Sequence, residues 1–217
     1  MELLYTDARI VVCLKPAGVL STDEPGGMPE LLRRALGEPE TGCVRTVHRL
    51  DAQTGGVMVF ARSRMAAALL SRQVRERQFS KCYLAVVHGV PQPQSGEMRD
   101  LLGRDSLRRV TYVADTPSAE TREALLSYET LGTVDGLSLV RVQLHTGRTH
   151  QIRVQFASRG LPLAGDRKYG LPEDDAPLAL WAYQLSFTHP QTDKEMTFTC
   201  PPPETAPWVR FALPAEK

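Results

Sequence analysis

The order of apolar and polar residues predicts a chain built mainly from short β-strands. Some apolar runs have the length and β-branched content of buried strands, and others alternate as half-buried strands do. The predicted strands are residues 9–14, 57–61, 81–89, 122–131, 137–145, 178–187 and 195–199. The turn Val134-Asp135-Gly136 joins two of them into a hairpin. The stretch 91–120 is rich in Pro, Ser and charge, and is expected to run over the surface.

Three short helices complete the predicted pattern. The first is expected around Glu30 to Leu36. The second runs from about Arg64 to Arg77 after Ser63, whose hydroxyl is suited to cap it. Its buried stripe is predicted to consist of Met65, Leu69, Leu70 and Val74. The third helix is expected to begin after Thr149 as its cap and to stop at Gly160.

Composition is that of an ordinary globular protein, with 42% hydrophobic and 24% charged residues in a chain of 217. No internal repeat or clear linker interrupts it, so residues 1–217 are predicted to form one continuous α/β domain. No apolar run approaches ~18 residues, and the N-terminus does not have the pattern of a signal peptide. The four cysteines lie far apart and form no CxxC pair, which favours a reducing compartment, the cytoplasm, over a disulfide framework or a zinc site.

The net charge of +1 conceals two strongly basic segments. Between Arg45 and Lys81 there are eight Lys or Arg against two acids, and between Arg141 and Lys168 six against one. Together they hold fourteen of the 26 basic residues. Binding to phosphate depends on the local field rather than on the total charge. The segments are therefore either a track for nucleic acid or solvated arginine-rich faces.

The stretch that organises the chain is His48-Arg49-Leu50-Asp51-Ala52-Gln53-Thr54-Gly55-Gly56, directly before the predicted strand 57–61. The two glycines allow a tight turn, so Asp51 is expected on a loop fixed at one end by the core. A carboxylate near the core needs a partner or a function, because burying it unpaired is very costly. Stabilisation of the turn is the simpler interpretation of Asp51.

Two further side chains could act together with Asp51. Arg153, on the third predicted helix, could keep Asp51 ionised through a charge-assisted hydrogen bond. Tyr83, near the start of the strand 81–89, could stack on a planar base and relay a proton. An aspartate so placed could attack an electrophilic carbon or take a proton. Taken singly, Tyr83 could equally be a core aromatic residue and Arg153 a surface or ion-pair residue.

Other kinds of catalytic site lack support in the sequence. It contains no GxSxG, GxxxxGK[ST] or strand-following GxGxxG motif, which argues against a serine hydrolase and against nucleotide-cofactor binding. The set His48, Asp51, His145 and His150 fits no zinc-site spacing. Asp51 also lacks the second nearby acid of an ordinary glycosidase pair.

Five motifs, taken in order, resemble the RluA family of RNA pseudouridine synthases. They are Lys15-Pro16-x-Gly18, His48-Arg49-Leu50-Asp51 with Thr54 and Gly56, Lys81-x-Tyr83-Leu84-Ala85, Thr146-Gly147-Arg148-Thr149-His150-Gln151-Ile152-Arg153, and Gly165-Asp166-x-x-Tyr169-Gly170. The resemblance runs from about residue 5 to 200. It implies a mixed α/β pseudouridine synthase fold, with a long, bent, mainly antiparallel sheet, flanking helices and a central cleft. It also implies isomerisation of selected uridines in ribosomal or transfer RNA without cofactor or metal.

The same resemblance assigns roles to individual residues. Asp51 would be the catalytic aspartate, which either adds to C1′ of the ribose or removes a proton from C2′. Tyr83 would lie against the base and help to remove its C5 proton, and Arg153 would pair with Asp51. Arg49 would enter the space left by the flipped nucleotide. The residues expected to contact the RNA are Arg49, His48, Thr54, Lys81, Arg148 and His150, with Arg72 and Arg75 on the outer face of the helix 64–77.

Some positions depart from the family pattern. Gly55 replaces a common serine, and Trp181 stands where a histidine is usual, so details of the pocket near both are open. We expect a monomer that binds RNA through this domain alone, without a small RNA-binding domain before residue 1. Two alternatives are an RNA-binding protein of this fold without turnover and a phosphate- or sugar-handling hydrolase. The intact Asp51, Tyr83 and Arg153 argue against the first, and the missing second acid argues against the second.

Overall fold

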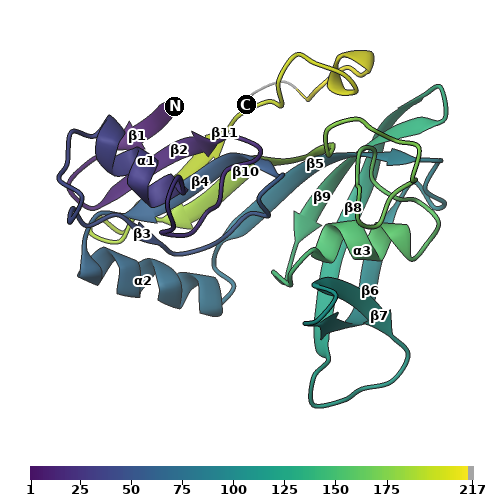
Figure 1. The fold of residues 1–217 in the computed structure, drawn as a ribbon, viewed down its shortest axis with the longest axis horizontal. Helices are drawn as coiled ribbons and strands as arrows, with labels where there is room; N and C mark the ends of the chain where they lie inside the picture. Colours follow the sequence, from purple (N-terminus) through teal and green to yellow (C-terminus); the bar gives the residue numbers. More distant parts are fainter. Residues whose placement is uncertain (215–217) are drawn as a thin grey trace. The chain divides into compact units, whose positions relative to one another are not determined.

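A computed structural model describes residues 1–214, which form two compact units (Figure 1). Unit 1 contains Met1–Lys81 and Ala182–Cys200, and unit 2 contains Cys82–Trp181 and the described residues from Pro201 onward. Strands predominate, and the described part of the chain has three α-helices: α1 (Met28–Ala35), α2 (Arg64–Arg75) and α3 (Gln151–Ala157). The predicted mixed α/β class is confirmed, and every strand pair with an assigned register is antiparallel.

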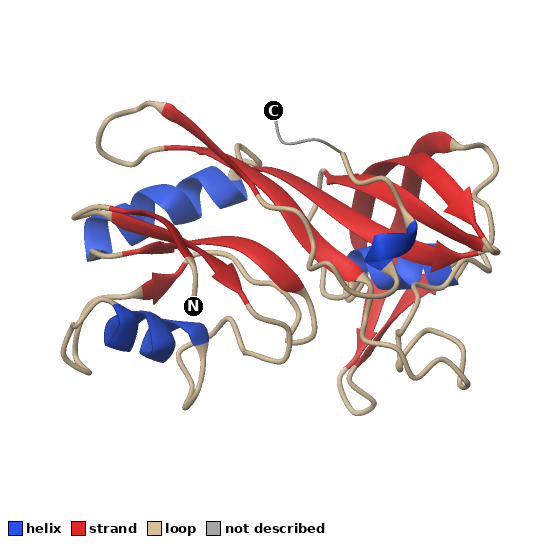
Figure 2. Cartoon of the chain, turned by 90° about the horizontal axis from the view of Figure 1, so that it is seen from above, coloured by secondary structure: helices blue, strands red, loops and turns tan. Residues whose placement is uncertain are grey.

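Unit 1 is a sheet that runs between two helices (Figures 1 and 2). Its strands are β1 (Leu3–Thr6), β2 (Ile10–Lys15), β3 (Arg45–Thr46), β4 (Gly55–Ala61), most of β10 (Leu180–Thr188) and β11 (Glu195–Thr199). They follow the order β1-β2-β4-β10, with β3 on β4 and β11 on β10. All seven residues of β4 are buried, as expected for a central strand covered on both faces.

The helix α2 packs on this sheet with a buried stripe that differs from the predicted one. Ser63 caps it as predicted, since its hydroxyl accepts a hydrogen bond of 3.1 Å from the amide of Ala66. Of the predicted stripe, Leu70 is buried as expected, but Met65 is 70% exposed, and Ala66 and Gln73 are buried beside Leu70. Gln73 tolerates burial because its side-chain amide bonds both backbone groups of Thr188, at 2.8 and 3.0 Å. The prediction for Met65 was wrong because the buried face follows the spacing i, i+4, i+7 through Ala66, Leu70 and Gln73, and Met65 lies about 100° around the helix from Ala66.

In unit 2, too, the strand pairs with an assigned register are all antiparallel. Its strands are β5 (Ser80–His88, which begins in unit 1), β6 (Ser95–Asp105), β7 (Val110–Ala114), β8 (Arg122–Val134) and β9 (Leu137–Leu144). They follow the order β5-β9-β8-β6-β7. The predicted hairpin between β8 and β9 is confirmed, and Asp135 and Gly136 both have positive φ, as in the tightest hairpin turns.

Two local predictions in unit 2 were wrong. The stretch 91–120 is not irregular, because β6 and β7 form a hairpin within it and bury Met98, Leu102 and Thr111. Thr149 does not cap α3, since the residue before the helix is His150, in the left-handed conformation at φ 54°. The helix α3 is short and almost wholly buried, and packs beside β6 and β7. Among the described residues, none of the helices has the length and apolar character needed to cross a membrane.

Candidate functional site

The loop that carries Asp51 is tied to the rest of unit 1 on both sides of that residue. The hydroxyl of Ser21 accepts a hydrogen bond from the amide of Leu50 at 3.1 Å and donates one to the carbonyl of Leu50 at 3.0 Å. On the other side, the amide of Gly18 bonds the carbonyl of Ala52 at 2.8 Å. The amide of Thr54 bonds the carbonyl of Asp51 itself at 3.0 Å, closing the turn. Asp51 remains partly exposed on this fixed loop.

A buried lysine reinforces the same loop. Lys15, the last residue of β2, is 0% exposed, and its ammonium donates hydrogen bonds to the carbonyls of Pro16, Val19 and Ala52. Burial lowers the pKa of Lys15 to about 8, and the negative charge of Asp51 acts in the opposite direction. Lys15 therefore interacts electrostatically with Asp51 and also donates a hydrogen bond to Ala52, the residue after Asp51.

His48 and Thr54 flank Asp51 in sequence but are buried in unit 1. The exposed fractions are 7% for His48 and 1% for Thr54. The amide of Val59 donates to Nε2 of His48 at 3.2 Å, so this nitrogen is unprotonated. Burial, with a further contribution from Lys81, lowers the pKa of His48 to about 3. His48 is thus a neutral group that holds the loop against β4, and direct contact of either residue with RNA stays a prediction.

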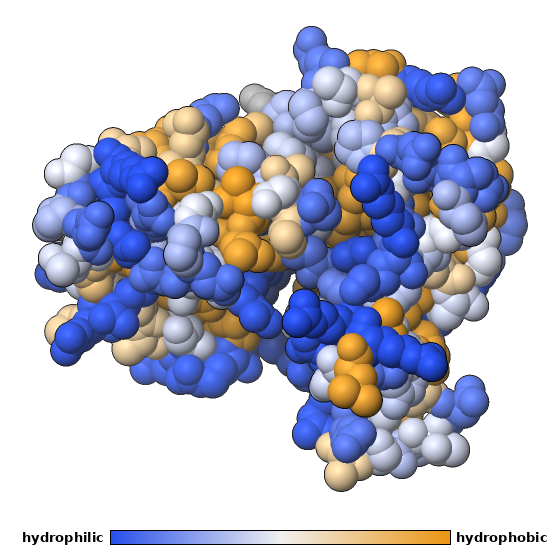
Figure 3. All heavy atoms as spheres, in the orientation of Figure 1, coloured by the Kyte–Doolittle hydropathy of each residue, from blue (hydrophilic) through white to orange (hydrophobic). Residues whose placement is uncertain are grey.

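The basic side chains predicted to meet RNA differ in exposure. Arg49 is exposed between the buried His48 and Leu50, so it faces solvent. Arg72 and Arg75 are exposed on the outer face of α2, where the surface of unit 1 is mostly hydrophilic (Figure 3). Lys81 is half-buried, lies 5.8 Å from the ring centroid of Phe79, and has its pKa lowered by desolvation.

In unit 2, the guanidinium of Arg153 forms a forked ion pair with Asp166. Nε and Nη2 of Arg153 each donate to one carboxylate oxygen at 2.7 Å. The Cζ of Arg153 also lies 5.2 Å from the ring centroid of Tyr169. Burial acts to raise the pKa of Asp166, but its hydrogen bonds and the charge of Arg153 outweigh burial and lower it. The pair is therefore charged on both sides, and the predicted pairing of Arg153 with Asp51 stays a prediction.

The other predicted residues of unit 2 surround α3 or lie on β5. Nδ1 of His150 lies 2.7 Å from the hydroxyl of Tyr169, and the Nε of Arg148 donates to the carbonyl of Glu123 at 2.9 Å. Arg148 is exposed, whereas Tyr83 on β5 is only 7% exposed. Trp181 is half-buried.

Comparison with known proteins decides which family these motifs represent. A sequence model described as RNA pseudouridylate synthase matches residues 9–158. The chain belongs to this family. The dual-specificity RNA pseudouridine synthase RluA of Escherichia coli is 36% identical to it, over 93% of this chain and 93% of the relative. The enzyme of the same name from Pasteurella multocida is 32% identical, also over 93% of both chains. The predicted resemblance to the RluA family is confirmed.

Solved structures place the synthase in the same fold. Human RNA Pseudouridylate Synthase Domain Containing 1 superposes with a TM-score of 0.80 at 25% identity, over 94% of this chain and 84% of the human one. The chain is therefore an RNA pseudouridine synthase, an isomerase whose substrate class is RNA. The matched stretch 9–158 includes residues of both units, and the prediction of a single catalytic domain over residues 1–217 stays a prediction.

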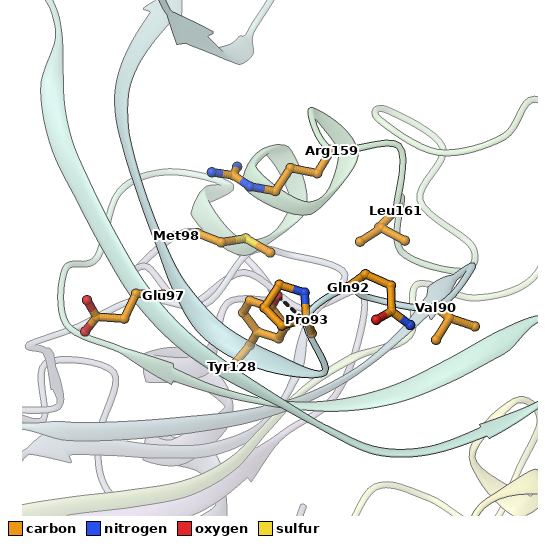
Figure 4. Close-up of a pocket in the computed structure, with 8 residues that line it drawn as sticks. All are labelled: Val90, Gln92, Pro93, Glu97, Met98, Tyr128, Arg159 and Leu161. Carbon is orange, nitrogen blue, oxygen red and sulfur yellow. Dashed lines mark hydrogen bonds between the residues drawn. The ribbon is translucent and has the colours of Figure 1, made fainter.

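A surface cavity in unit 2 of the synthase is lined by residues other than the predicted site residues. It has a volume of about 460 Å³ and is lined by Val90, Gln92, Pro93, Glu97, Met98, Tyr128, Arg159 and Leu161 (Figure 4). None of these lining residues was predicted to act in catalysis or RNA binding. In the part of the chain that the structure describes, no group of three or more His, Cys, Asp or Glu is arranged to hold a metal ion.

Three residues of the synthase had no role predicted from the sequence, although each lies in a quoted motif. Lys15 supports the Asp51 loop, and Asp166 and Tyr169 surround the guanidinium of Arg153. The motifs Lys15-Pro16-x-Gly18 and Gly165-Asp166-x-x-Tyr169-Gly170 were the available signal. They identify turns, and a turn does not reveal which distant side chain its polar residue will bond.

Proposed function

We propose that this synthase converts selected uridines of ribosomal or transfer RNA to pseudouridine, with Asp51 as its catalytic carboxylate. The observation that carries the proposal is the match to RluA of E. coli along nearly the full length of both chains. The printed name of that relative describes an enzyme of dual specificity. A ribosomal large subunit pseudouridine synthase D from Neisseria meningitidis is also 34% identical, over 94% of this chain and 58% of the relative.

The reaction is an isomerisation, so its atoms balance without an added reactant. The bond between C1′ of the ribose and N1 of the uracil breaks, the base turns, and a bond forms between C1′ and C5. The proton on C5 leaves, and N1 of the product carries a proton. Asp51 either adds to C1′ and is later displaced, or removes a proton from C2′ and returns it. Either course needs an ionised carboxylate beside the sugar.

The remaining predicted residues take supporting parts in this proposal. Tyr83 lies against the uracil and helps to remove the C5 proton, and Arg153 pairs with Asp51. Arg49, exposed next to the Asp51 loop, fills the space that the everted nucleotide leaves in the RNA. Arg148, His150, Lys81 and the exposed Arg72 and Arg75 contact the phosphates and bases around it. The enzyme acts as a monomer in the cytoplasm, without metal or cofactor.

The decisive experiment replaces the carboxylate of Asp51, the proposed catalyst, with an uncharged amide. Wild type and Asp51→Asn are incubated with unmodified transfer and ribosomal RNA, and pseudouridine is mapped by carbodiimide-dependent primer stops. We expect stops at defined uridines with wild type and none with Asp51→Asn, while RNA binding is retained. Asp193→Asn, at an exposed aspartate on a turn of unit 1, is the matched control and keeps wild-type activity.

Two results would contradict the proposal. Equal activity of wild type and Asp51→Asn would remove Asp51 from the mechanism but leave the isomerase assignment intact. Binding of RNA by wild type without pseudouridine in either class of RNA would favour the alternative, a protein of this fold without turnover on these substrates.

A further inference from the structure

The carboxylate of Asp166, beside Arg153, is fully buried and accepts four hydrogen bonds. Its side chain is 0% exposed and that of Arg153 is 10% exposed. One of its oxygens accepts from Nη2 of Arg153 at 2.7 Å and from the amides of Lys168 and Tyr169 at 2.9 and 3.1 Å. The other accepts from Nε of Arg153 at 2.7 Å. Four donors from three residues therefore fix the plane of this carboxylate.

The ring of Tyr169 constrains the same guanidinium, and two bonds hold the ring. The hydroxyl of Tyr169 accepts from the amide of Thr111 on β7 at 2.8 Å and lies 2.7 Å from Nδ1 of His150. The ring centroid is 5.2 Å from Cζ of Arg153, within the range of a cation–π contact. The guanidinium thus lies between a fixed carboxylate and a fixed ring.

The loop that carries Asp166 and Tyr169 is packed too closely to shift easily. A Cβ atom on Gly165 would lie 2.2 Å from the carbonyl oxygen of Pro177, and one on Gly170 would lie 2.3 Å from that of Asp166. Gly165 also has a φ of 70°, which favours glycine. The loop itself, through its tight backbone and the amides of Lys168 and Tyr169, therefore helps to set the position of the Asp166 carboxylate that faces Arg153.

A role in stability alone explains this pair poorly. Taking two charges out of water is costly, so a buried ion pair is often no more stabilising than apolar side chains of the same size. What the forked geometry provides is direction, because two parallel hydrogen bonds fix the plane of a guanidinium. Nη1 of Arg153 takes no part in the fork, and its direction is fixed along with the plane.

We propose that Asp166 is a positioning residue, which holds the guanidinium of Arg153 in the single orientation that the isomerisation needs. This inference rests on the proposed function, in which Arg153 supports the catalytic carboxylate. Asp166 itself touches neither substrate nor reacting atoms. Tyr169 assists by confining the guanidinium from its face. Misplacing a catalytic group by about 1 Å can slow a reaction about 100-fold, so loss of the fork should act on the chemical step.

The first test compares Asp166→Asn with wild type in single-turnover pseudouridine formation, with RNA affinity and thermal unfolding measured on the same samples. We expect the rate constant to fall by about 100-fold and the Kd for RNA to change by less than about threefold. Asp100→Asn is the matched control, because it removes the acid from another ion pair of this region, with Arg159, at 2.9 Å. It should keep the wild-type rate. A wild-type rate in Asp166→Asn would overturn the inference.

A second variant covers the outcome in which Asp166→Asn fails to fold. Asp166→Glu keeps the buried charge opposite Arg153 but moves the carboxylate by one methylene group. A folded Asp166→Glu enzyme with a reduced single-turnover rate and unchanged RNA affinity supports positioning. A folded Asp166→Glu enzyme that works at the wild-type rate would show that a buried charge opposite Arg153 is sufficient, and would overturn the positioning role.

A third measurement separates positioning from a structural role. If Asp166 acts only through Arg153, the double variant Arg153→Ala/Asp166→Asn is no slower than Arg153→Ala. Guanidinium ion added to Arg153→Ala should restore part of the rate, and it should restore less in the double variant, which lacks the carboxylate that holds it. Additive losses, or equal rescue of both variants, would count against the inference.

The proposed function can fail separately in the same assay. A wild type that forms no pseudouridine, or an Asp51→Asn variant with full activity, would refute the proposed function or its catalyst. An active wild type, an inactive Asp51→Asn and a fully active Asp166→Asn would refute only the positioning role.

Discussion

Lys15 donates a hydrogen bond of 2.9 Å from its ammonium group to the carbonyl oxygen of Ala52, the residue that follows Asp51. Lys15 pairs with Gly56 in the antiparallel register of β2 and β4, so it stands opposite the start of the strand that follows the Asp51 loop. The amide of Gly18 bonds the same carbonyl at 2.8 Å. On the side that follows Asp51, the loop is therefore fixed by one buried cation and one backbone amide, from the end of β2 and the turn after it.

Replacing Lys15 by methionine tests this support. Lys15→Met keeps the length of the side chain but removes the donor from the carbonyls of Pro16, Val19 and Ala52. We expect the free energy of unfolding to fall by about 1–3 kcal/mol, because buried acceptors lose their partner. Pseudouridine formation should fall at least about tenfold as the loop loosens. Urea unfolding and a single-turnover assay measure the two effects.

The control for this substitution is Lys194→Met, at an exposed lysine of unit 1. It should change neither the unfolding free energy nor the rate. A Lys15→Met enzyme with wild-type stability and rate would show that Gly18 and the turn hold the loop without the lysine.

Gly56 is a position where any side chain would collide with backbone. Its φ is 123°, and a Cβ atom would lie 2.3 Å from the carbonyl oxygen of Ala182 and 2.7 Å from its nitrogen. Gly56→Ala should therefore lower the free energy of unfolding by about 3–5 kcal/mol. Gly136→Ala is the control, because φ there is 75° and nothing lies within 4 Å. It should cost about 1–2 kcal/mol from backbone strain alone. Equal losses in urea unfolding would show that β4 and β10 separate to admit a methyl group.

Much of the fold could be predicted because local signals agreed with it. The buried run 57–61 is the fully buried β4, and Ser63 caps the helix that follows. The edge hairpin of β6 and β7 was missed because only four of the sixteen residues in its two strands are buried, and just two of these, Met98 and Leu102, are large and apolar. A strand that is polar on one face and interrupted by charge has the composition of a loop.

The motifs of the site could be predicted from the sequence, but the side chains and carbonyls that its residues bond in the fold could not. The sequence contains 25 acidic residues that could meet Arg153, and no periodicity selects among them. The structure selects Asp166, thirteen residues further along, because the tight turn at Gly165 returns the chain to α3. In the same way Lys15 reaches Ala52 only because β2 and β4 are neighbours, a pairing between segments about forty residues apart.

His48 should make the stability of the protein depend on pH. Its pKa is lowered from 6.5 to about 3 by burial, so between these values the unfolded chain binds a proton that the folded chain does not. The contribution of neutral His48 to the free energy of unfolding is therefore complete above pH 6.5. It is lost as the pH falls towards 3, by up to about 1.4 kcal/mol for each pH unit. His48→Gln, whose amide oxygen can accept from Val59, removes this dependence.

The measurement is the free energy of urea unfolding at pH 7, 6 and 5 for wild type, His48→Gln and the control His145→Gln at an exposed histidine. The slope of stability against pH should be shallower in His48→Gln than in the other two proteins. Identical slopes in all three would show that folded His48 binds the proton as readily as the unfolded chain does, so that burial does not keep its imidazole neutral.

The exposed arginines on α2 should contribute to RNA affinity through charge alone. Arg72 and Arg75 lie within a segment that carries eight basic residues and two acids, and both point to solvent. Arg72→Ala/Arg75→Ala should weaken binding about tenfold at low salt. It should also reduce the slope of log Kd against log salt by about 1.5, because two phosphate contacts, and the counterions that they release, are lost. The control Arg34→Ala/Arg210→Ala removes two exposed arginines outside the basic segments and should leave the slope unchanged. Equal slopes for wild type and the α2 double variant would show that this helix faces away from bound RNA.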